Sequence, residues 1–473
     1  MRAAKSVPLK VGPRLPHRFE TAPSHVTSSA MTDATPSRPA AIPQTRLGRA
    51  SRMGAMAAGV AGNMAVGGLR ALGTGQRPDR RDLLLTPANL RRLADTLAQM
   101  RGAAMKMGQL MSMDSGDALP PELSDILARL RADADFMPPK QLRQVLNTAW
   151  GPDWHRRFKR FDVRPIAAAS IGQVHQAWLP DGTHLAIKVQ YPGIARSIDS
   201  DVANLGRLMR LSGLLPKSFD LDPYLSEAAA QLREEADYAA EADHLRRFGT
   251  LMAGNDDFIV PQVHDPLCTG QVLAMEFIAS KPIESLETAD QPTRDAAMTH
   301  LLALTLRELF DFGWMQTDPN FANYRIADGG RLVLLDFGAT RAVPGWIPPA
   351  CRALIRAGMA GDHAGVAEQL DHMGLVPATT PEPHLGRILN MATMVFDDLR
   401  AAPVLDLGTS DLSRRLQREG EALARAGFVP EDPVPLDLLF LQRKIAGMFL
   451  LAARLGARVP VADLLAPYLK DTA

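Results

Sequence analysis

The sequence has little of what would assign a protein to a specialised class. Its 473 residues include only two cysteines, Cys268 and Cys351, so a disulfide framework and a zinc cluster are excluded and a reducing compartment is expected. The net charge of +1 gives no reason to expect nucleic acid as a partner. Aromatic residues make up 5% of the chain, whereas alanine, leucine and arginine are plentiful. This composition indicates a globular, mostly helical protein with enough residues for two or three domains.

Long hydrophobic runs are also missing. A membrane-spanning helix needs about 20 apolar residues, and the uncharged apolar stretch at residues 445–453 is too short. Residues 53–69 are uncharged but also too few, and they include Asn63. Small residues recur four apart within them, which permits close helix packing. For the segment 51–75 we therefore keep two hypotheses: a Gly/Ala-rich surface helix, and a helix that enters a membrane weakly or self-associates.

Residues 1–50 are predicted to form a disordered basic tail. Up to residue 52 the chain has nine Lys or Arg residues and two acids, with many Pro, Ser and Thr residues and little periodicity. An Arg-rich, acid-poor start is also typical of a targeting segment, but repeated prolines argue against a clean amphipathic presequence. Met31 is a second candidate for the true start of the chain.

A helical extension is predicted over residues 76–160. Thr86 followed by Pro87 is a helix start signal, and apolar residues then recur at spacings of three and four up to residue 111. Lys106 and Gln109 are three apart, so they project from one side of this helix. By residue type alone, such a pair favours a solvated face.

Residues 167–192 are predicted to contain two strands joined at a Pro-Asp-Gly turn at residues 180–182. Lys188 lies on the second strand, where kinases place an ammonium against nucleotide phosphates. The loop that would cover the phosphates has alanines in place of the usual glycines. Alanine is also small, but it has less access to positive φ, so this loop should be stiffer. The alternative for Lys188 is an exposed strand lysine. The residues of this alanine loop are Ala167, Ala168, Ala169 and Ser170.

An acidic helix is expected next, because residues 225–248 contain no Gly or Pro. Its carboxylates are close in sequence and need a cation opposite them. Lys188 and Lys106 are the two candidates for that cation. The alternative is a solvated acidic face balanced by arginines. The acidic residues are Glu234, Glu235, Asp237 and Glu241, and the arginines are Arg233, Arg246 and Arg247.

A further strand, residues 271–280, leads to a break in the position of the kinase hinge. The residues expected to meet the adenine there are Met275, Glu276 and Phe277.

The most informative stretch is residues 314–341. Asp318 and Asn323 are five residues apart, and Asp336 follows thirteen residues later as the first residue of a DFG sequence. Between them residues 331–337 are predicted to form a buried strand. The kinase catalytic loop has this layout, in which an Asp orients the nucleophile and an Asn and the DFG Asp hold Mg²⁺. The spacing therefore predicts a phosphoryl-transfer site, and the alternative is a pair of ordinary turn aspartates.

Taken together, these motifs resemble the UbiB family of atypical kinase-like proteins, and most closely the mitochondrial coenzyme Q kinase-like ATPases. The resemblance runs from about residue 80 to the C-terminus. It implies an α+β, bilobal kinase-like fold with the helical extension packed over the active site, an N-lobe over 161–278 and a helical C-lobe over 279–473. The matching motifs are KxGQ (Lys106, Gly108 and Gln109), the alanine loop, AIK (Lys188), ExD (Glu235 and Asp237), QTDPNFAN and DFG.

The resemblance also implies roles for these residues. Lys188 would pair with Glu241, and Asp318 would take the catalytic-base position. Asn323 and Asp336 would bind Mg²⁺. The regulatory pair Lys106 and Gln109 would lie where a protein substrate otherwise enters, with Lys106 near Glu235 and Asp237.

The activity implied is that of an ATPase or small-molecule kinase supporting ubiquinone biosynthesis, with ATP and Mg²⁺ as cofactors. The implied partners are quinone-biosynthesis enzymes or a lipid precursor, with peripheral membrane contact and a homodimer as further hypotheses. The expected location is the cytoplasmic side of a bacterial inner membrane or, alternatively, the mitochondrial matrix face.

Departures from protein kinases keep other functions open. Gln316 and Thr317 stand where His-Arg precedes the catalytic Asp, and no Ala-Pro-Glu signature follows the DFG. A conventional protein kinase is therefore the weaker alternative, and a non-catalytic nucleotide-binding scaffold is the third. The remaining segments, 292–312 and 345–470, are predicted to be helical. The amphipathic run 434–455 is predicted to be a core helix interrupted by Arg443 and Lys444, with contact to lipid or to a partner as the alternative.

Overall fold

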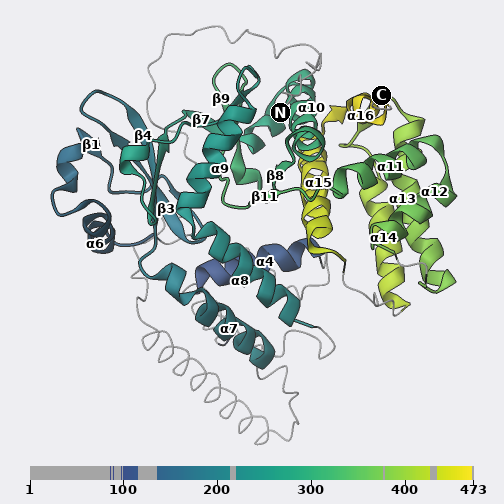
Figure 1. Ribbon diagram of the computed structural model, residues 1–473, viewed down its shortest axis with the longest axis horizontal. Helices are drawn as coiled ribbons and strands as arrows, with labels where there is room; N and C mark the ends of the chain where they lie inside the picture. The colour runs from purple at the N-terminus through teal and green to yellow at the C-terminus, as the bar shows by residue number, and fades with distance from the viewer. Residues whose placement is uncertain are drawn as a thin grey trace, which may run out of the picture. The chain divides into compact units, whose positions relative to one another are not determined.

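The computed structural model describes residues 100–114, 136–212, 220–376, 379–426 and 434–470, together with Thr86, Asn89 and Leu97. They form two compact units (Figure 1). We call N-lobe the unit that contains the described residues up to Arg246 together with Gln262–Phe277, and C-lobe the unit that contains Arg247–Pro261 and the residues from Ile278 onward. The predicted tail 1–50 and the segment 51–75 lie outside the described residues.

The N-lobe contains a five-stranded sheet in which β1, β3, β4 and β6 are neighbours in that order and β2 also pairs with β3. All of these pairs are antiparallel. The strands are β1 (Arg160–Phe161), β2 (Ala167–Ala168), β3 (Gly172–Trp178), β4 (His184–Gln190) and β6 (Val272–Glu276). The helices of this lobe are α4 (Arg101–Asp114), α6 (Pro139–Trp150), α7 (Ile194–Ser212), α8 (Asp222–Glu235) and the start of α9 (Tyr238–Leu251).

The β3–β4 hairpin forms as the sequence predicts. Gly182 has a φ of 94°, which suits glycine, and the Asp181 carboxylate accepts a hydrogen bond of 2.8 Å from the Thr183 backbone N–H. The register places Lys188 opposite Val174. The turn chemistry therefore fixes the position of the lysine in the sheet.

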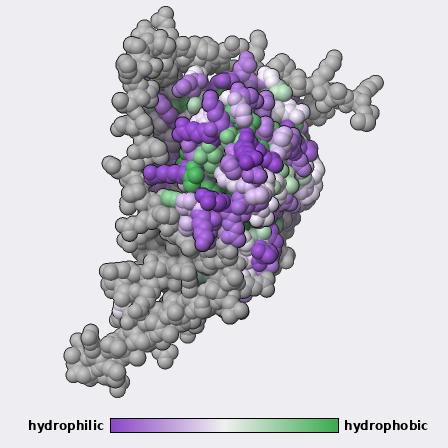
Figure 2. All heavy atoms as spheres, turned by 90° about the vertical axis from the view of Figure 1, so that its left-hand side faces the viewer, coloured by the Kyte–Doolittle hydropathy of each residue, from purple (hydrophilic) through white to green (hydrophobic). Residues whose placement is uncertain are grey.

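Helices of the predicted extension pack inside the N-lobe. The Thr86 hydroxyl accepts a hydrogen bond from the Asn89 N–H, as expected for a helix cap. Further along, α4 packs against α7 and α8, and α6 packs against β4. The side of the N-lobe that carries β1 and α6 has a mostly hydrophilic described surface with small hydrophobic patches (Figure 2).

The prediction of a single acidic helix over residues 225–248 is wrong, because the helix is interrupted between α8 and α9. Ala236 ends α8, and the Asp237 carboxylate accepts a hydrogen bond of 3.0 Å from the Ala240 N–H at the start of α9. The Gln190 side chain also donates to the Ala236 carbonyl oxygen at 2.9 Å. An aspartate that caps a new helix, with a sheet residue binding the break, outweighs the propensity for one continuous helix.

The C-lobe contains a four-stranded sheet, β5–β10–β9–β7, and two short ribbons, β8–β11 and β12–β13. Its strands are β5 (Phe258–Ile259), β7 (Ser280–Pro282), β8 (Trp314–Gln316), β9 (Tyr324–Ala327), β10 (Leu332–Leu334), β11 (Thr340–Ala342), β12 (Leu405–Asp406) and β13 (Arg458–Val459). Its helices are α10 (Gln291–Arg307), α11 (Ile347–Ala360), α12 (His363–His372), α13 (Glu382–Ala401), α14 (Leu412–Arg425), α15 (Leu436–Leu455) and α16 (Val461–Leu469).

The helical character predicted for the C-lobe is confirmed, and α15 packs against α10 beside the group formed by α11 to α14 (Figure 1). Leu438 and Leu441 of α15 join a buried cluster with Leu309 and Met315. The core position predicted for α15 is therefore confirmed. Among the helices of the described residues, none is both long and apolar enough to span a bilayer.

A buried histidine in β3 gives the N-lobe a predictable response to acid. His175 is fully buried, and its Nδ1 lies 2.8 Å from the Asp162 carbonyl oxygen. Gln173 accepts a hydrogen bond from the Met137 N–H with its oxygen, so its amide nitrogen donates to His175 Nε2 at 2.9 Å. The ring is therefore neutral with its proton on Nδ1, and burial lowers the pKa of His175 to about 4.

We expect the free energy of unfolding to fall as the pH drops from 6.5 towards 4. In this pH range the unfolded chain binds a proton at His175 that the folded chain does not bind. The free energy of unfolding is therefore about 2 kcal/mol lower at pH 5 than at pH 7. Urea unfolding of wild type and His175→Gln at pH 7 and pH 5 measures this loss. The variant should lose less, because glutamine does not bind a proton in this range. Equal losses in the two proteins would contradict the assignment.

Candidate active site

In the N-lobe, the predicted site residues are arranged around Lys188. Its ammonium lies 2.7 and 2.9 Å from the two carboxylate oxygens of Glu241. The two side chains are 8% and 2% exposed, respectively. Glu241 lies in the first turn of α9, where the helix dipole favours a carboxylate, and the Tyr238 ring lies 5.2 Å from the ammonium. Of the two lysines considered as partners of the acidic residues, Lys188 thus pairs with Glu241. The alternative that Lys188 is an exposed strand lysine is excluded.

The alanine loop is shorter than predicted, because Ala167 and Ala168 form β2 against β3. Only Ala169 and Ser170 lie in the turn, where the Ala169 N–H donates to the Gly172 carbonyl at 2.8 Å. A Cβ on Gly172 would lie 2.5 Å from the Tyr238 hydroxyl, so only glycine fits at the end of this turn. The loop that the sequence predicts to cover the phosphates is therefore a tight hairpin built with alanine.

Lys106 of α4 is held against this hairpin. It is 2% exposed and lies 2.6 Å from Glu235, whose other carboxylate oxygen accepts a hydrogen bond from the Ser170 hydroxyl. Close approach is possible because Gly102 faces the loop, where a Cβ would lie 3.1 Å from the Ser170 carbonyl oxygen. The prediction of a solvated face for Lys106 is thus wrong, because the partly buried carboxylate of Glu235 and the small-residue contact at Gly102 draw the helix onto the loop.

For the two other predicted regulatory residues, the relation to Lys106 stays a prediction. Asp237 is exposed and caps α9. Gln109 lies on α4, but its side chain is outside the described part of the structure.

The predicted hinge residues lie at the end of β6. Met275 is buried and pairs with Ala186 inside the sheet, while Glu276 is exposed. The Phe277 N–H donates to the His184 carbonyl at 3.0 Å, and its ring stacks on His184 with centroids 4.1 Å apart. The Phe277 N–H is therefore already hydrogen-bonded within the sheet. Adenine recognition by the other groups of Met275, Glu276 and Phe277 stays a prediction.

In the C-lobe, the predicted site residues follow β8. After Asp318 a short 3-10 helix, Phe321–Asn323, presents Asn323, and β9 and β10 then form a hairpin that returns the chain. The Leu335 N–H donates to the Asn323 carbonyl at 2.8 Å, which brings Asp336 beside Asn323. The Asn323 amide nitrogen donates to the Asp318 carbonyl at 3.4 Å. The buried strand predicted before the DFG is therefore confirmed as β10, which pairs with β9 in a hairpin.

Asp336 has an unusual backbone. Its φ is 57°, and it is the one described non-glycine residue with a positive φ. A hydrogen bond of 3.2 Å from the Gly338 N–H reaches its carboxylate, and Gln316 donates to its carbonyl at 3.1 Å. Nearby, the Thr317 hydroxyl donates to the Ala339 carbonyl at 2.8 Å. Gln316 and Thr317, which replace His-Arg in the sequence, thus bind the DFG segment directly.

Comparison with known proteins assigns this geometry to a family. The chain matches the ABC1 atypical kinase-like domain over residues 129–370. It belongs to the ABC1 atypical kinase-like family. The fold and the family that the motifs predicted are both confirmed.

Relatives of this ABC1 protein cover much of its length. It is 34% identical to "Atypical kinase coq-8, mitochondrial" of Caenorhabditis elegans, over 96% of this chain and 61% of the relative. It is 35% identical to "Atypical kinase COQ8, mitochondrial" of Saccharomyces cerevisiae, over 89% of this chain and 84% of the relative. The chain therefore spans less than two thirds of the worm protein. Among solved structures, the erythromycin complex of Rv3197 from Mycobacterium tuberculosis is similar in fold, with a TM-score of 0.57 and 24% identity over 77% of this chain and 92% of that chain.

A buried polar network of the ABC1 protein was missed by the sequence analysis. Lys444 of α15 is 2% exposed in its side chain and contacts Gln316, Tyr324 and Glu308. The only signal in the sequence was a lysine inside an apolar helical run. Because solvated lysines at helix surfaces are common, that signal did not identify the partners, which lie more than 100 residues earlier in the chain.

The residues of this ABC1 protein fit a nucleotide-bound Mg²⁺ ion. A carboxylate and an amide oxygen are the hard ligands that Mg²⁺ prefers. Asn323 donates with its nitrogen to Asp318, which leaves the amide oxygen as the atom suited to a cation. Asp336 lies next to it at the end of the hairpin. Asn323 and Asp336 are therefore the residues that would hold the metal.

Proposed function

We propose that this protein is an atypical kinase-like ATPase that binds ATP with Mg²⁺ and hydrolyses it or phosphorylates a small molecule or lipid in support of ubiquinone biosynthesis. One observation carries the proposal: the β9–β10 hairpin returns Asp336 beside Asn323, directly after the loop that contains Asp318. A carboxylate for the nucleophile and two metal ligands are thereby gathered within one short stretch.

Each lobe contributes a distinct task. In the C-lobe, Asp318 orients and deprotonates the attacking hydroxyl, while Asn323 and Asp336 hold Mg²⁺, which when bound neutralises phosphate charge. In the N-lobe, Lys188 is oriented by Glu241 and binds nucleotide phosphates, and the turn at Ala169 and Ser170 covers them.

The contact between α4 and the alanine loop supports a regulatory role. Lys106 neutralises Glu235, and Glu235 in turn accepts a hydrogen bond from Ser170, so the loop and the extension move together. We propose that this link occupies space that a peptide substrate would need, which favours a small acceptor over a conventional protein-kinase substrate. Gln109 belongs to the same proposal.

The biological setting follows from the relatives. The worm and yeast relatives are named as mitochondrial atypical kinases of the COQ8 group. We propose that this chain works at the periphery of a membrane with quinone-biosynthesis enzymes or a lipid precursor, on the cytoplasmic side in a bacterium or on the matrix side in a mitochondrion, and that it forms a homodimer.

The decisive test is ATP turnover by the full chain with Mg²⁺ and anionic liposomes. Asp318→Asn is expected to lower turnover by about 10²- to 10⁴-fold, because it removes the general base, while ATP binding is kept. The control is Asp328→Asn, the same change at an exposed position of the β9–β10 turn, which should turn over ATP like the wild type.

Other results would redirect the assignment. Equal turnover in wild type and Asp318→Asn would remove the catalytic role of Asp318. Binding of ATP without turnover in any variant would favour the scaffold. Rapid phosphorylation of a generic peptide would favour the conventional kinase.

A further inference from the structure

A lysine on a distant helix lies beneath the candidate catalytic loop. Lys444, near the middle of α15, has its ammonium 3.0 Å from the side-chain oxygen of Gln316 and 2.8 Å from the hydroxyl of Tyr324. The nearest oxygen of Glu308 is 3.4 Å away. All four residues are at least 95% buried. The C-lobe thus keeps a cation, a carboxylate, a phenol and an amide out of water in one cluster.

Hydrogen-bond chemistry fixes the direction of each contact. An ammonium only donates, so Gln316 and Tyr324 both accept from Lys444. The Tyr324 hydroxyl then donates its own proton to Gln316 Oε1 at 3.1 Å. Two donors therefore converge on the oxygen of the Gln316 amide, and its nitrogen must point the other way.

That nitrogen binds the backbone of the candidate metal ligand. Gln316 Nε2 donates to the Asp336 carbonyl oxygen at 3.1 Å. Asp336 has a φ of 57°, a conformation that an aspartate keeps only when its surroundings enforce it. The path from Lys444 to the Asp336 backbone is thus two hydrogen bonds long.

We propose that Lys444 is a positioning residue for the phosphoryl-transfer site: its ammonium orients the Gln316 amide, which holds the backbone of Asp336 in the conformation that presents its carboxylate. This inference rests on the proposed function, which makes Asp336 a metal ligand. The contacts that carry it lie entirely within the C-lobe.

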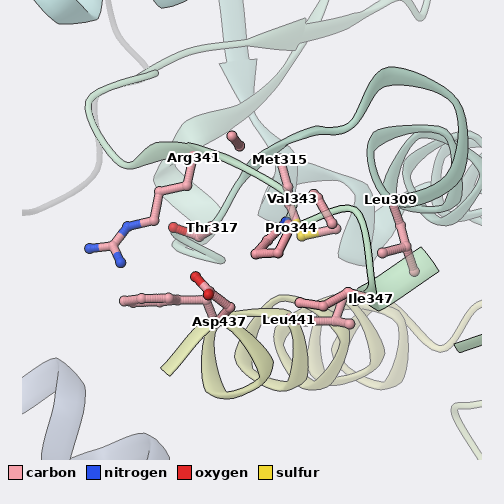
Figure 3. Close-up of a pocket in the computed structure, with 11 residues that line it drawn as sticks. Leu309, Met315, Thr317, Arg341, Val343, Pro344, Ile347, Asp437 and Leu441 are labelled. Atoms are coloured by element: carbon pink, nitrogen blue, oxygen red, sulfur yellow. The ribbon is translucent and has the colours of Figure 1, made fainter. Parts of the chain in front are cut away.

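The helix that carries Lys444 is packed closely against the same loop. Gly447 is one turn further along α15, and a Cβ there would lie 2.2 Å from Cβ of Pro319, the residue after Asp318. At the start of the helix Phe440 packs under the Arg341 guanidinium at 3.7 Å from the ring centroid. The pocket left between α15 and the segments that include Thr317 and Arg341 holds about 20 Å³, which is room for about one water molecule (Figure 3). A shift of α15 would therefore be transmitted to the loop.

The charge state of the cluster agrees with this role. Burial alone would lower the pKa of Lys444, but Glu308 and Tyr324 outweigh it, so the net shift of the Lys444 pKa is upward and the ammonium is retained. Burial raises the pKa of Glu308, although the charge of Lys444 and a hydrogen bond from the Gln316 N–H oppose that shift. Lys444 thus stays a donor at neutral pH.

Removing Lys444 alone would leave Glu308 as a buried charge and could unfold the lobe, so the test uses a double variant. Lys444→Met combined with Glu308→Gln removes both charges and keeps the side-chain volumes. We expect this full-length protein to fold, and to lose about 10- to 100-fold in Mn²⁺ affinity in the presence of ATP, as is typical when a group that orients a metal ligand is removed.

Two readouts separate this inference from the proposed function. Mn²⁺ binding with ATP is followed by electron paramagnetic resonance, and hydrogen exchange of residues 335–341 is measured without nucleotide. Faster exchange of that segment in the double variant is expected whether or not the wild type hydrolyses ATP. Wild-type exchange together with wild-type Mn²⁺ affinity would overturn the positioning role, while absence of turnover in the wild type would overturn only the proposed function.

The control is Leu451→Ala, which creates a cavity on the same helix at a fully buried position. It should lower the stability but leave the Mn²⁺ affinity of the folded protein within about twofold, because Leu451 is not part of the hydrogen-bonded path to Asp336. If Leu451→Ala weakens Mn²⁺ binding as much as the double variant does, the effect is general loosening of α15 and the specific role of Lys444 is refuted.

Discussion

Asp336→Asn is expected to abolish Mg²⁺-dependent nucleotide binding. Asparagine has nearly the same shape and can keep the hydrogen bond from the Gly338 N–H, but it carries no charge to offset a divalent cation. At a ligand concentration of a hundred times Kd, binding adds about 2.7 kcal/mol to the free energy of unfolding. Thermal unfolding with ATP, with and without Mg²⁺, should show this increment in the wild type and lose it in the variant.

The matched control is again Asp328→Asn, which makes the same chemical change in the β9–β10 turn at an exposed residue. It should keep the Mg²⁺-dependent increment. If Asp336→Asn also keeps it, Asp336 is not a metal ligand and the assignment of the DFG sequence is wrong. If both variants lose it, the hairpin itself has been disturbed and the comparison says nothing specific about the carboxylate.

The spacing of short motifs was enough to predict the chain geometry of the candidate site. Asp318 and Asn323 lie on one tight loop, and the strand predicted before the DFG is β10, whose pairing with β9 returns the chain to Asn323. In the N-lobe, the turn at residues 180–182 fixed the position of Lys188. These features depend on local chemistry, which is why the sequence alone specified them.

Features that depend on distant partners were not predictable in the same way. Asp237 begins a new helix, and the break is bound by Gln190 from a strand more than 40 residues earlier. Lys106 and Lys444 are both buried, although lysine usually stays in water. Each burial is stabilised by a carboxylate far away in the sequence. For Lys106 the residue type therefore gave the wrong environment, and for Lys444 it did not reveal the partners.

Lys188→Met is expected to destabilise the N-lobe as well as to abolish phosphoryl transfer. The substitution leaves the Glu241 carboxylate, which is 2% exposed, without its ammonium. Breaking a buried ion pair on one side costs about 3–5 kcal/mol, because the remaining charge is neither solvated nor neutralised. Low activity of this single variant would therefore not distinguish misfolding from a loss of phosphate binding.

The double variant Lys188→Met with Glu241→Met separates the two effects. Replacing both charges by apolar side chains removes the uncompensated carboxylate, so most of the lost free energy of unfolding should return. ATP turnover should stay absent, since no cation faces the phosphates. Urea unfolding and turnover are measured on wild type, both single variants and the double variant. Activity that returns along with stability would show that Lys188 is a structural residue, whereas stability without activity assigns its ammonium to the nucleotide.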